Sequence, residues 1–166
     1  LRTQSVRLSD FHVAPMCTPT RGQLLTGMDA ARNGSINVSS GRALLRPEIP
    51  TMANFFADAG YRTGVFGKWH LGDCYPTRAM DQGLDETLVH RAGGIGQPAG
   101  PLGAEGKYTD PVLFHNGTRV QTRGYCTDVY FDAAISWMKK QHAKGQPFFT
   151  YLQANAPHGP FHDVPE

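Results

Sequence analysis

Two short segments of the chain combine a potential nucleophile with cations and an imidazole, a set suited to chemistry on an anionic ester. The first, Cys17-Thr-Pro-Thr-Arg21, places a thiol where Pro19 favours the start of a helix. Backbone N–H groups and the helix dipole at such a position stabilise negative charge, and the guanidinium of Arg21 can bind an anionic oxygen. The segment is compatible with Cys17 as a nucleophile, and a buried cysteine beside a capping loop stays open as the alternative.

The second segment follows a predicted strand over 61–66. Lys68 and His70 are two residues apart, so in an extended chain their side chains point to the same side. A lysine there can bind an anionic oxygen, and a histidine can move a proton near neutral pH. The alternative is that both are merely solvated while their neighbours pack. His158, in a Pro-flanked turn after another apolar strand, is a third candidate.

These side chains need elements that bring them together. Hydrophobic periodicity and turn residues predict helices over 20–28, 51–59 and 127–143, strands over 6–13, 61–66 and 147–153, and a hairpin over 112–120. Helix-then-strand units with short links favour an α/β fold, a sheet flanked by helices. Ligands of such folds gather beyond the carboxyl ends of the strands, where Lys68, His70 and His158 fall. Most of 29–50 and 67–111 is expected to be loop, and the second stretch to be functional surface.

The composition is that of an ordinary globular domain. The 166 residues carry a formal net charge of +2 and 40% hydrophobic residues, with Lys and Arg scattered. This charge gives no argument for a nucleic acid or an anionic membrane as partner, and no apolar run approaches a membrane span. The chain has no initiator Met and stops soon after His158, so we expect an internal piece of a longer protein.

The remaining cysteines and histidines carry no metal-binding pattern. The cysteines lack the CxxC spacing of a zinc site. Cys74 and Cys126 are expected to be lone buried thiols, with a disulfide between them as the alternative. Five histidines are expected to be structural: His12, His90, His115, His142 and His162.

Two whole motifs carry a resemblance to a known family. The run from Cys17 to Gly27, C-T-P-T-R-G-Q-L-L-T-G, is similar to the sulfatase signature C-x-P-[ST]-R with its leucine-rich T-G ending. The run from Gly67 to Gly72, G-K-W-H-L-G, resembles the second sulfatase signature, and the two occur in family order and spacing. The resemblance implies that residues 1–166 are part of a single catalytic domain with an alkaline-phosphatase-like α/β three-layer sandwich, incomplete at both ends.

The resemblance also implies a reaction. A separate maturation enzyme would oxidise Cys17 to formylglycine, whose hydrated aldehyde would attack the sulfur of an aryl or carbohydrate sulfate ester. The covalent sulfate intermediate would then collapse by elimination. Arg21 would hold the formylglycine, and Lys68 would bridge it to the sulfate. His70 would act as base on the second hydroxyl, and His158 would bind the sulfate or help the leaving oxygen.

The family's cofactor is a divalent cation, usually calcium, with magnesium less expected. Calcium takes about six to eight oxygen ligands, and of these the chain offers only the formylglycine made from Cys17. The family's acidic pair near the N-terminus and its later Asp-Asn pair are not in the chain, so the other ligands are expected outside it. The chain alone is therefore expected to be inactive. Family habit implies a periplasmic or extracellular location, or a lysosomal one in a eukaryote.

Three alternatives to a sulfatase stay open at this point. One is a formylglycine-dependent phosphonate or phosphodiester hydrolase on the same scaffold. Another is a catalytically dead homologue that binds sulfated glycans, against which the intact set of candidate residues argues. The third is a thiol enzyme in which Cys17 acts as a thiolate and is open to alkylation.

Overall fold

A five-stranded sheet in the order β4-β3-β2-β1-β5 forms the centre of the computed structural model. The model describes residues 2–38, 43–97, 107–159 and 161. The three strands β2, β1 and β5 run parallel, and β3 and β4 add an antiparallel hairpin at the β2 edge. The strand bounds are Arg62–Lys68 (β1), Glu86–His90 (β2), Val112–His115 (β3), Thr118–Gln121 (β4) and Phe148–Gln153 (β5).

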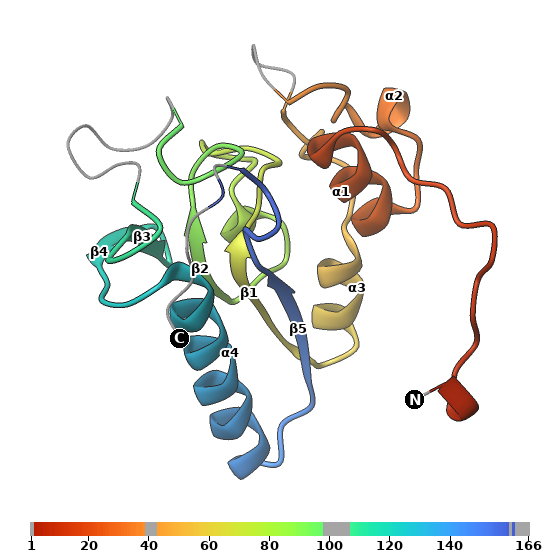
Figure 1. Ribbon diagram of the computed structural model, residues 1–166. Coiled ribbons are helices and arrows are strands. Elements are labelled where there is room, and N and C mark those ends of the chain that lie inside the picture. Colours follow the sequence, from red (N-terminus) through yellow and green to blue (C-terminus); the bar gives the residue numbers. More distant parts are fainter. Residues whose placement is uncertain (1, 39–42, 98–106, 160, 162–166) are drawn as a thin grey trace.

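Helices cover both faces of this sheet (Figure 1). One face carries α4, and the other carries α1 and α3. The bounds are Cys17–Thr26 (α1), Ala30–Asn33 (α2), Met52–Asp58 (α3) and Cys126–Ala143 (α4), with 3₁₀ turns at Arg2–Gln4 and Ala79–Asp81. The helix–sheet–helix arrangement confirms the predicted three-layer α/β sandwich.

The two cores form because adjacent residues of β1 point to opposite faces. Val65 packs with residues of α1 and α3, whereas Phe66 packs with α4. Every residue of β1 after Arg62 is buried, as expected of a central parallel strand covered on both faces. The α4 side of the core includes Tyr130, Ala134 and Trp137, whose spacing of three and four places them on one helix face.

Several predicted elements hold and others need correction. The helices over 51–59 and 127–143, the strands over 61–66 and 147–153 and the hairpin over 112–120 are confirmed within a few residues. The helix predicted over 20–28 begins earlier, so that Cys17 itself lies in its first turn. The largest miss within 67–111 is β2, a short β-branched run in a stretch predicted as mostly loop. Residues 98–106 of that stretch lie outside the described part.

The strand predicted over 6–13 is wrong. These residues have no regular secondary structure, and Val6, Leu8, Phe11 and Val13 are exposed. A strand needs a neighbour for its backbone hydrogen bonds, and the sheet pairs no described strand with this segment. The alternation of the sequence alone therefore overstated its strand character.

One of the two cysteine predictions is confirmed and the other is wrong. Cys126 is a free, buried thiol as expected, whereas Cys74 is free but exposed, so the prediction of a buried thiol there is wrong. Neither is in a disulfide. No helix in the described part of the chain is long and apolar enough to cross a membrane.

Candidate active site

Cys17 occupies the first position of α1, at the rim of a cavity of about 500 Å³. The preceding Met16 is extended, and its carbonyl oxygen accepts the N–H of Thr20, which closes the first helical turn. The cavity is lined by Pro15, Met16, Cys17, Val38, His70, Gly93, Gln97 and His158. The thiol of Cys17 is partly buried and its Sγ lies 3.2 Å from Nδ1 of His70. The predicted nucleophile and imidazole are therefore in direct contact.

His70 is fixed against Cys17 by contacts to its backbone and to its ring. Its backbone is left-handed, with φ of 57°, and its carbonyl oxygen accepts the hydroxyl of Thr18, the residue after Cys17. Its Nε2 lies 3.2 Å from the carbonyl oxygen of Val38. Gly93 covers the ring so closely that a Cβ there would lie 2.5 Å from Cε1 of His70. A left-handed backbone in a residue other than glycine is uncommon and is typical of functional positions.

Burial and a neighbouring charge keep the His70 imidazole neutral. The residue is 5% exposed. Burial, followed by the positive charge of Lys68, lowers the pKa of His70 from 6.5 to about 4. A neutral ring can accept a proton on one nitrogen and donate from the other, which suits a residue beside a nucleophile.

Lys68 is the last residue of β1 and its side chain is 3% exposed. Burial lowers the pKa of Lys68; Cys17 opposes this effect through charge and hydrogen bonding, and Arg21 adds to it. A buried ammonium is stable when an anion compensates its charge. Lys68 therefore supplies a positive centre beside Cys17, although it is not among the residues that line the cavity.

Arg21 holds the end of β1 rather than the thiol itself. Its Nη1 donates to the carbonyl oxygen of Lys68 at 2.7 Å, while its Nε is buried without a hydrogen-bond partner. An unpaired buried donor of a guanidinium is costly unless a ligand completes it. The predicted role of Arg21 in holding a formylglycine stays a prediction.

His158 lines the same cavity and is exposed. Its backbone N–H donates to the carbonyl oxygen of Asn155 at 2.8 Å, closing a tight turn that contains the cis peptide Ala156–Pro157. Its Nδ1 lies 2.6 Å from the carbonyl oxygen of Gly159. The structure thus brings His158 to the cavity of Cys17 and His70, as the strand-end argument predicted.

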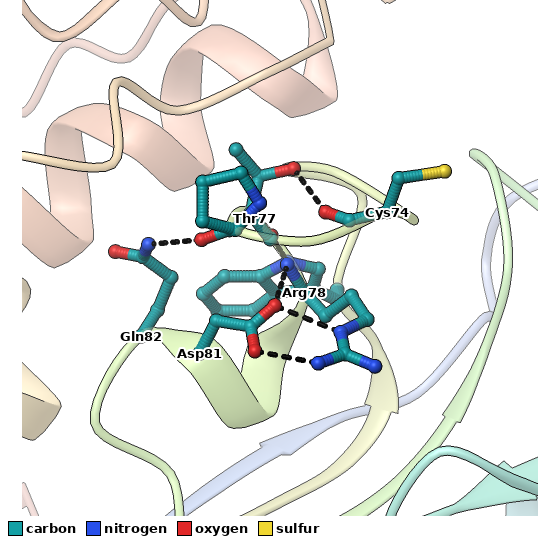
Figure 2. A network of polar contacts seen from close by, with 7 residues as sticks. Cys74, Thr77, Arg78, Asp81 and Gln82 are labelled. Atoms are coloured by element: carbon teal, nitrogen blue, oxygen red, sulfur yellow. Dashed lines mark hydrogen bonds and ion pairs between the residues drawn. The ribbon is translucent and has the colours of Figure 1, made fainter.

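Trp69, between Lys68 and His70, anchors the motif in the core. Its indole Nε1 donates to the carbonyl oxygen of Thr77 at 3.0 Å, and the ring is 1% exposed. Figure 2 shows the polar contacts that hold this segment: Thr77 Oγ1 to Cys74, Gln82 Nε2 to Pro76, and the ion pair of Arg78 with Asp81. The sulfur of Cys74 points away from this network (Figure 2). The network fixes Trp69, and with it the directions of its two neighbours.

The described residues do not hold a metal by themselves. Across 2–38, 43–97, 107–159 and 161, no three His, Cys, Asp or Glu side chains form a cluster that could hold a metal ion. Calcium needs a shell of oxygen ligands, so these residues alone do not fit a calcium site.

Sequence reasoning missed several parts of the site. The Gly93 and Gln97 wall comes from the loop after β2, a strand that was not predicted, and Gln97 Oε1 accepts the N–H of Gly93 at 3.0 Å. A signal for β2 existed in the run Glu86-Thr-Leu-Val-His, but no motif marks the wall itself. Among the histidines expected to be structural, His90 is buried at the end of β2. His162 lies outside the described residues.

Comparison with known proteins shows which family has this sequence and fold. The sulfatase family model matches residues 1–166. An arylsulfatase of Klebsiella aerogenes is 33% identical over 95% of this chain and 36% of its own length. The chain spans about a third of the length of the curated relatives it matches.

Solved structures agree on the fold. Ps i-CgsB, solved in complex with k-i-k-neocarrahexaose, superposes with a TM-score of 0.75 at 25% identity, over 88% of this chain and 36% of that one. BT4656, solved in complex with its substrate D-glucosamine-2-N,6-O-disulfate, gives a TM-score of 0.72 at 27% identity, over 92% of this chain and 27% of that one. The fold is the alkaline-phosphatase-like α/β fold that the two motifs implied. The chain belongs to the sulfatase family.

Proposed function

We propose that the full-length protein hydrolyses sulfate esters at the cavity that contains Cys17, His70 and His158. The observation that carries the proposal is the thiol of Cys17 at the start of α1, 3.2 Å from His70. Membership of the sulfatase family supports the same reaction. A buried lysine beside the thiol supplies the positive charge that a sulfate group requires.

A sulfated glycan is the substrate class we propose, with an aryl sulfate as an artificial substrate. Two solved relatives support this choice, since they hold a neocarrahexaose and a disulfated glucosamine. His158 lines the cavity and is exposed to solvent, so a substrate chain bound beside it can extend into solvent. The identity of the sugar is left to substrate screening.

Conversion of Cys17 to formylglycine by a maturation enzyme is the second part of the proposal. Formylglycine would supply a geminal hydroxyl as the attacking group and a second one whose deprotonation releases the product. The Nδ1 of His70 is the nearest base, within 3.2 Å of Cys17 Sγ. Lys68 would neutralise charge on the sulfate oxygens, and His158 would bind sulfate or protonate the leaving oxygen.

Calcium, with magnesium as the less favoured ion, stays part of the proposal. Formylglycine at position 17 would contribute one ligand, and the others would come from sequence outside this chain. The described residues hold no cluster of metal-ligating side chains, so no step is derived through the ion.

We further propose a periplasmic or extracellular location, or a lysosomal one in a eukaryote, because the family resemblance implies it. Fractionation of cells expressing the full-length protein, with immunodetection in each fraction, tests the location. Recovery in the cytoplasmic fraction alone would contradict it.

A thiol enzyme with Cys17 as its nucleophile is the second candidate, supported by the contact of its Sγ with Nδ1 of His70, which can accept the thiol proton. A thiol–imidazole pair is the arrangement of thiol enzymes. Alkylation separates the two candidates, since iodoacetamide blocks a thiolate at position 17 and leaves formylglycine untouched.

The test is Cys17→Ala in the full-length protein, co-expressed with a maturation enzyme, with Cys74→Ala as the matched control. We expect Cys17→Ala to lower sulfate release by at least on the order of 10⁴-fold, because the nucleophile is lost. The thiol of Cys74 is exposed and does not line the cavity, so its variant is expected to match the unmodified protein. Parallel assays on a matched phosphate diester decide between sulfatase and phosphodiesterase.

Retained sulfate release in Cys17→Ala would refute the mechanism. Binding of sulfated glycans without turnover of any ester would identify the protein as a dead homologue instead.

A further inference from the structure

Two buried polar side chains that do not belong to the candidate set are in contact at the end of β1. His90 ends β2 and Asn155 follows β5, and each is 3% exposed. The His90 Nε2 lies 2.7 Å from Asn155 Oδ1. Because β1 lies between β2 and β5 in the sheet, this contact crosses the end of β1, where Lys68 is the register partner of His90.

Asn155 also begins the turn that carries His158. Its backbone carbonyl oxygen accepts the His158 N–H at 2.8 Å. The two hydrogen-bond partners of His158 among the described residues, Asn155 and Gly159, both belong to its own turn. The position of that turn therefore depends on what holds Asn155 and Gly159. The carbonyl oxygen of Gly159 accepts the Tyr108 hydroxyl at 3.4 Å, a long contact, whereas the buried Asn155 side chain is 2.7 Å from His90.

The contact between His90 and Asn155 holds both side chains in fixed positions. A polar side chain removed from water costs free energy unless it is hydrogen-bonded, so both groups are constrained to this geometry. The Nδ1 of His90 lies 2.8 Å from the carbonyl oxygen of Arg91, which fixes the ring from its other side. Burial lowers the pKa of His90 to about 4, so the ring is neutral and carries one N–H. Because Nδ1 donates that proton to the Arg91 carbonyl oxygen, Nε2 accepts, and the Asn155 amide donates to it once its oxygen and nitrogen are exchanged by a flip. The flip also gives a partner to the Asn155 amide nitrogen, which is otherwise buried without one.

We infer that His90 and Asn155 are positioning residues that set His158 at the cavity wall for the hydrolysis. The expected effect on activity rests on the proposed function, whereas the positioning of His158 rests on the contacts alone. The contact between His90 and Asn155 connects the end of β2 to the turn after β5. It crosses β1, the strand that ends at Lys68. Small displacements of a catalytic group are enough to lower activity on the order of 10²-fold.

The first test compares His90→Leu and Asn155→Leu with the conservative His90→Gln in the full-length protein. The matched control is Thr87→Val, on the same strand β2 as His90. It removes a buried hydroxyl that donates to Oδ1 of Asn116 in the turn between β3 and β4. We expect the Leu variants to lower kcat/KM on a sulfate ester with a poor leaving group on the order of 10²-fold. Esters with good leaving groups need less help from His158, so the loss there is smaller. His90→Gln restores most of the activity, and Thr87→Val retains it.

Two readouts distinguish positioning from general destabilisation. In a His158→Ala background, His90→Leu is expected to add little, because both changes remove the same contribution. Losses that multiply in the double variant would overturn the inference. The second readout needs no turnover: amide exchange at His158 is expected to be at least about tenfold faster in His90→Leu and unchanged in Thr87→Val.

These readouts separate the two proposals. Absence of sulfate release from the unmodified protein would refute the proposed function, while the exchange rate at His158 still decides the positioning role. Unchanged exchange in both Leu variants would overturn the inference whatever the activity.

Discussion

At the residue scale, the site depends on a neutral imidazole held against Cys17. Burial and the charge of Lys68 lower the pKa of His70 to about 4, while Thr18 and Val38 fix its backbone and ring. Gly93 completes this enclosure, since it leaves no room for a Cβ between its backbone and the His70 ring. The glycine is therefore required by contact rather than by loop geometry.

Gly93→Ala is expected to displace His70 and lower kcat/KM by roughly 10- to 100-fold, because the new methyl group would lie 2.5 Å from its ring. The neighbouring Gly94→Ala is the matched control, since a Cβ there meets only the end of the Gln97 side chain at 3.4 Å. Steady-state kinetics on one aryl sulfate compare the two variants. Equal losses would show that the Gly93 contact does not position His70.

At the element scale, the end of β1 lies directly against β5. Gly67 has φ of 111°, and a Cβ there would lie 1.9 Å from the carbonyl oxygen of Gln153. Only glycine permits this approach one residue before Lys68. This close packing fixes the position of Lys68 along β1 relative to the turn after β5, and therefore relative to His158.

We expect Gly67→Ala to lower the free energy of unfolding by roughly 2–5 kcal/mol, from a strained backbone and an overpacked strand pair. Gly145→Ala is the control, because its φ of 64° carries the same kind of strain with no atom within 4 Å of the added Cβ. Its expected loss is about 1–2 kcal/mol. Urea unfolding measures both values, and a Gly67→Ala loss no larger than that of Gly145→Ala would contradict the account.

The sequence predicts some elements better than others for physical reasons. The hairpin around Asn116-Gly117 and the helix α4 follow from local turn chemistry and periodicity, so both could be read directly. The short strand β2 carries only a weak local signal in its five residues, and its pairing with β1, a long-range contact, completes it. The strand predicted over 6–13 failed for the converse reason, since alternation without a partner does not form a strand.

The candidate site divides along the same line. Motif residues such as Cys17 and His70 could be predicted because their types and spacing suggest chemistry. His90 and Asn155 could not be predicted as site residues, because they are 65 positions apart in the sequence and no motif joins them. Only the pairing of β2 and β5 with β1 brings their side chains to 2.7 Å. The tertiary fold, rather than the motif, defines the supports of the site.

At the scale of the whole molecule, the buried His90 makes stability depend on pH. Its pKa is about 4 in the folded protein, against 6.5 for an ordinary histidine. The unfolded chain therefore takes up the proton at a higher pH than the folded protein. It follows that the free energy of unfolding begins to decrease as the pH falls through about 6.5. The decrease due to His90 is complete below about pH 4, where the ring is protonated in the folded protein as well.

Between pH 7 and about pH 4.5 the unmodified protein is expected to lose roughly 2–3 kcal/mol more than His90→Gln, in which the titrating ring is gone. Urea unfolding at both pH values measures the two differences. A common offset between the proteins at both pH values reflects lost packing and cancels. An identical pH-dependent loss in both would show that His90 does not titrate as its burial requires.

The central claim is that Cys17 becomes the formylglycine of a sulfatase, and peptide mass spectrometry tests it most directly. The full-length protein is expressed with a maturation enzyme, and the tryptic peptide of residues 8–21 is measured, with a hydrazine reagent to trap an aldehyde. The account predicts a mass loss that matches conversion of the thiol side chain to an aldehyde, together with trapping at position 17. An unmodified cysteine, under conditions that convert a control sulfatase, would contradict it.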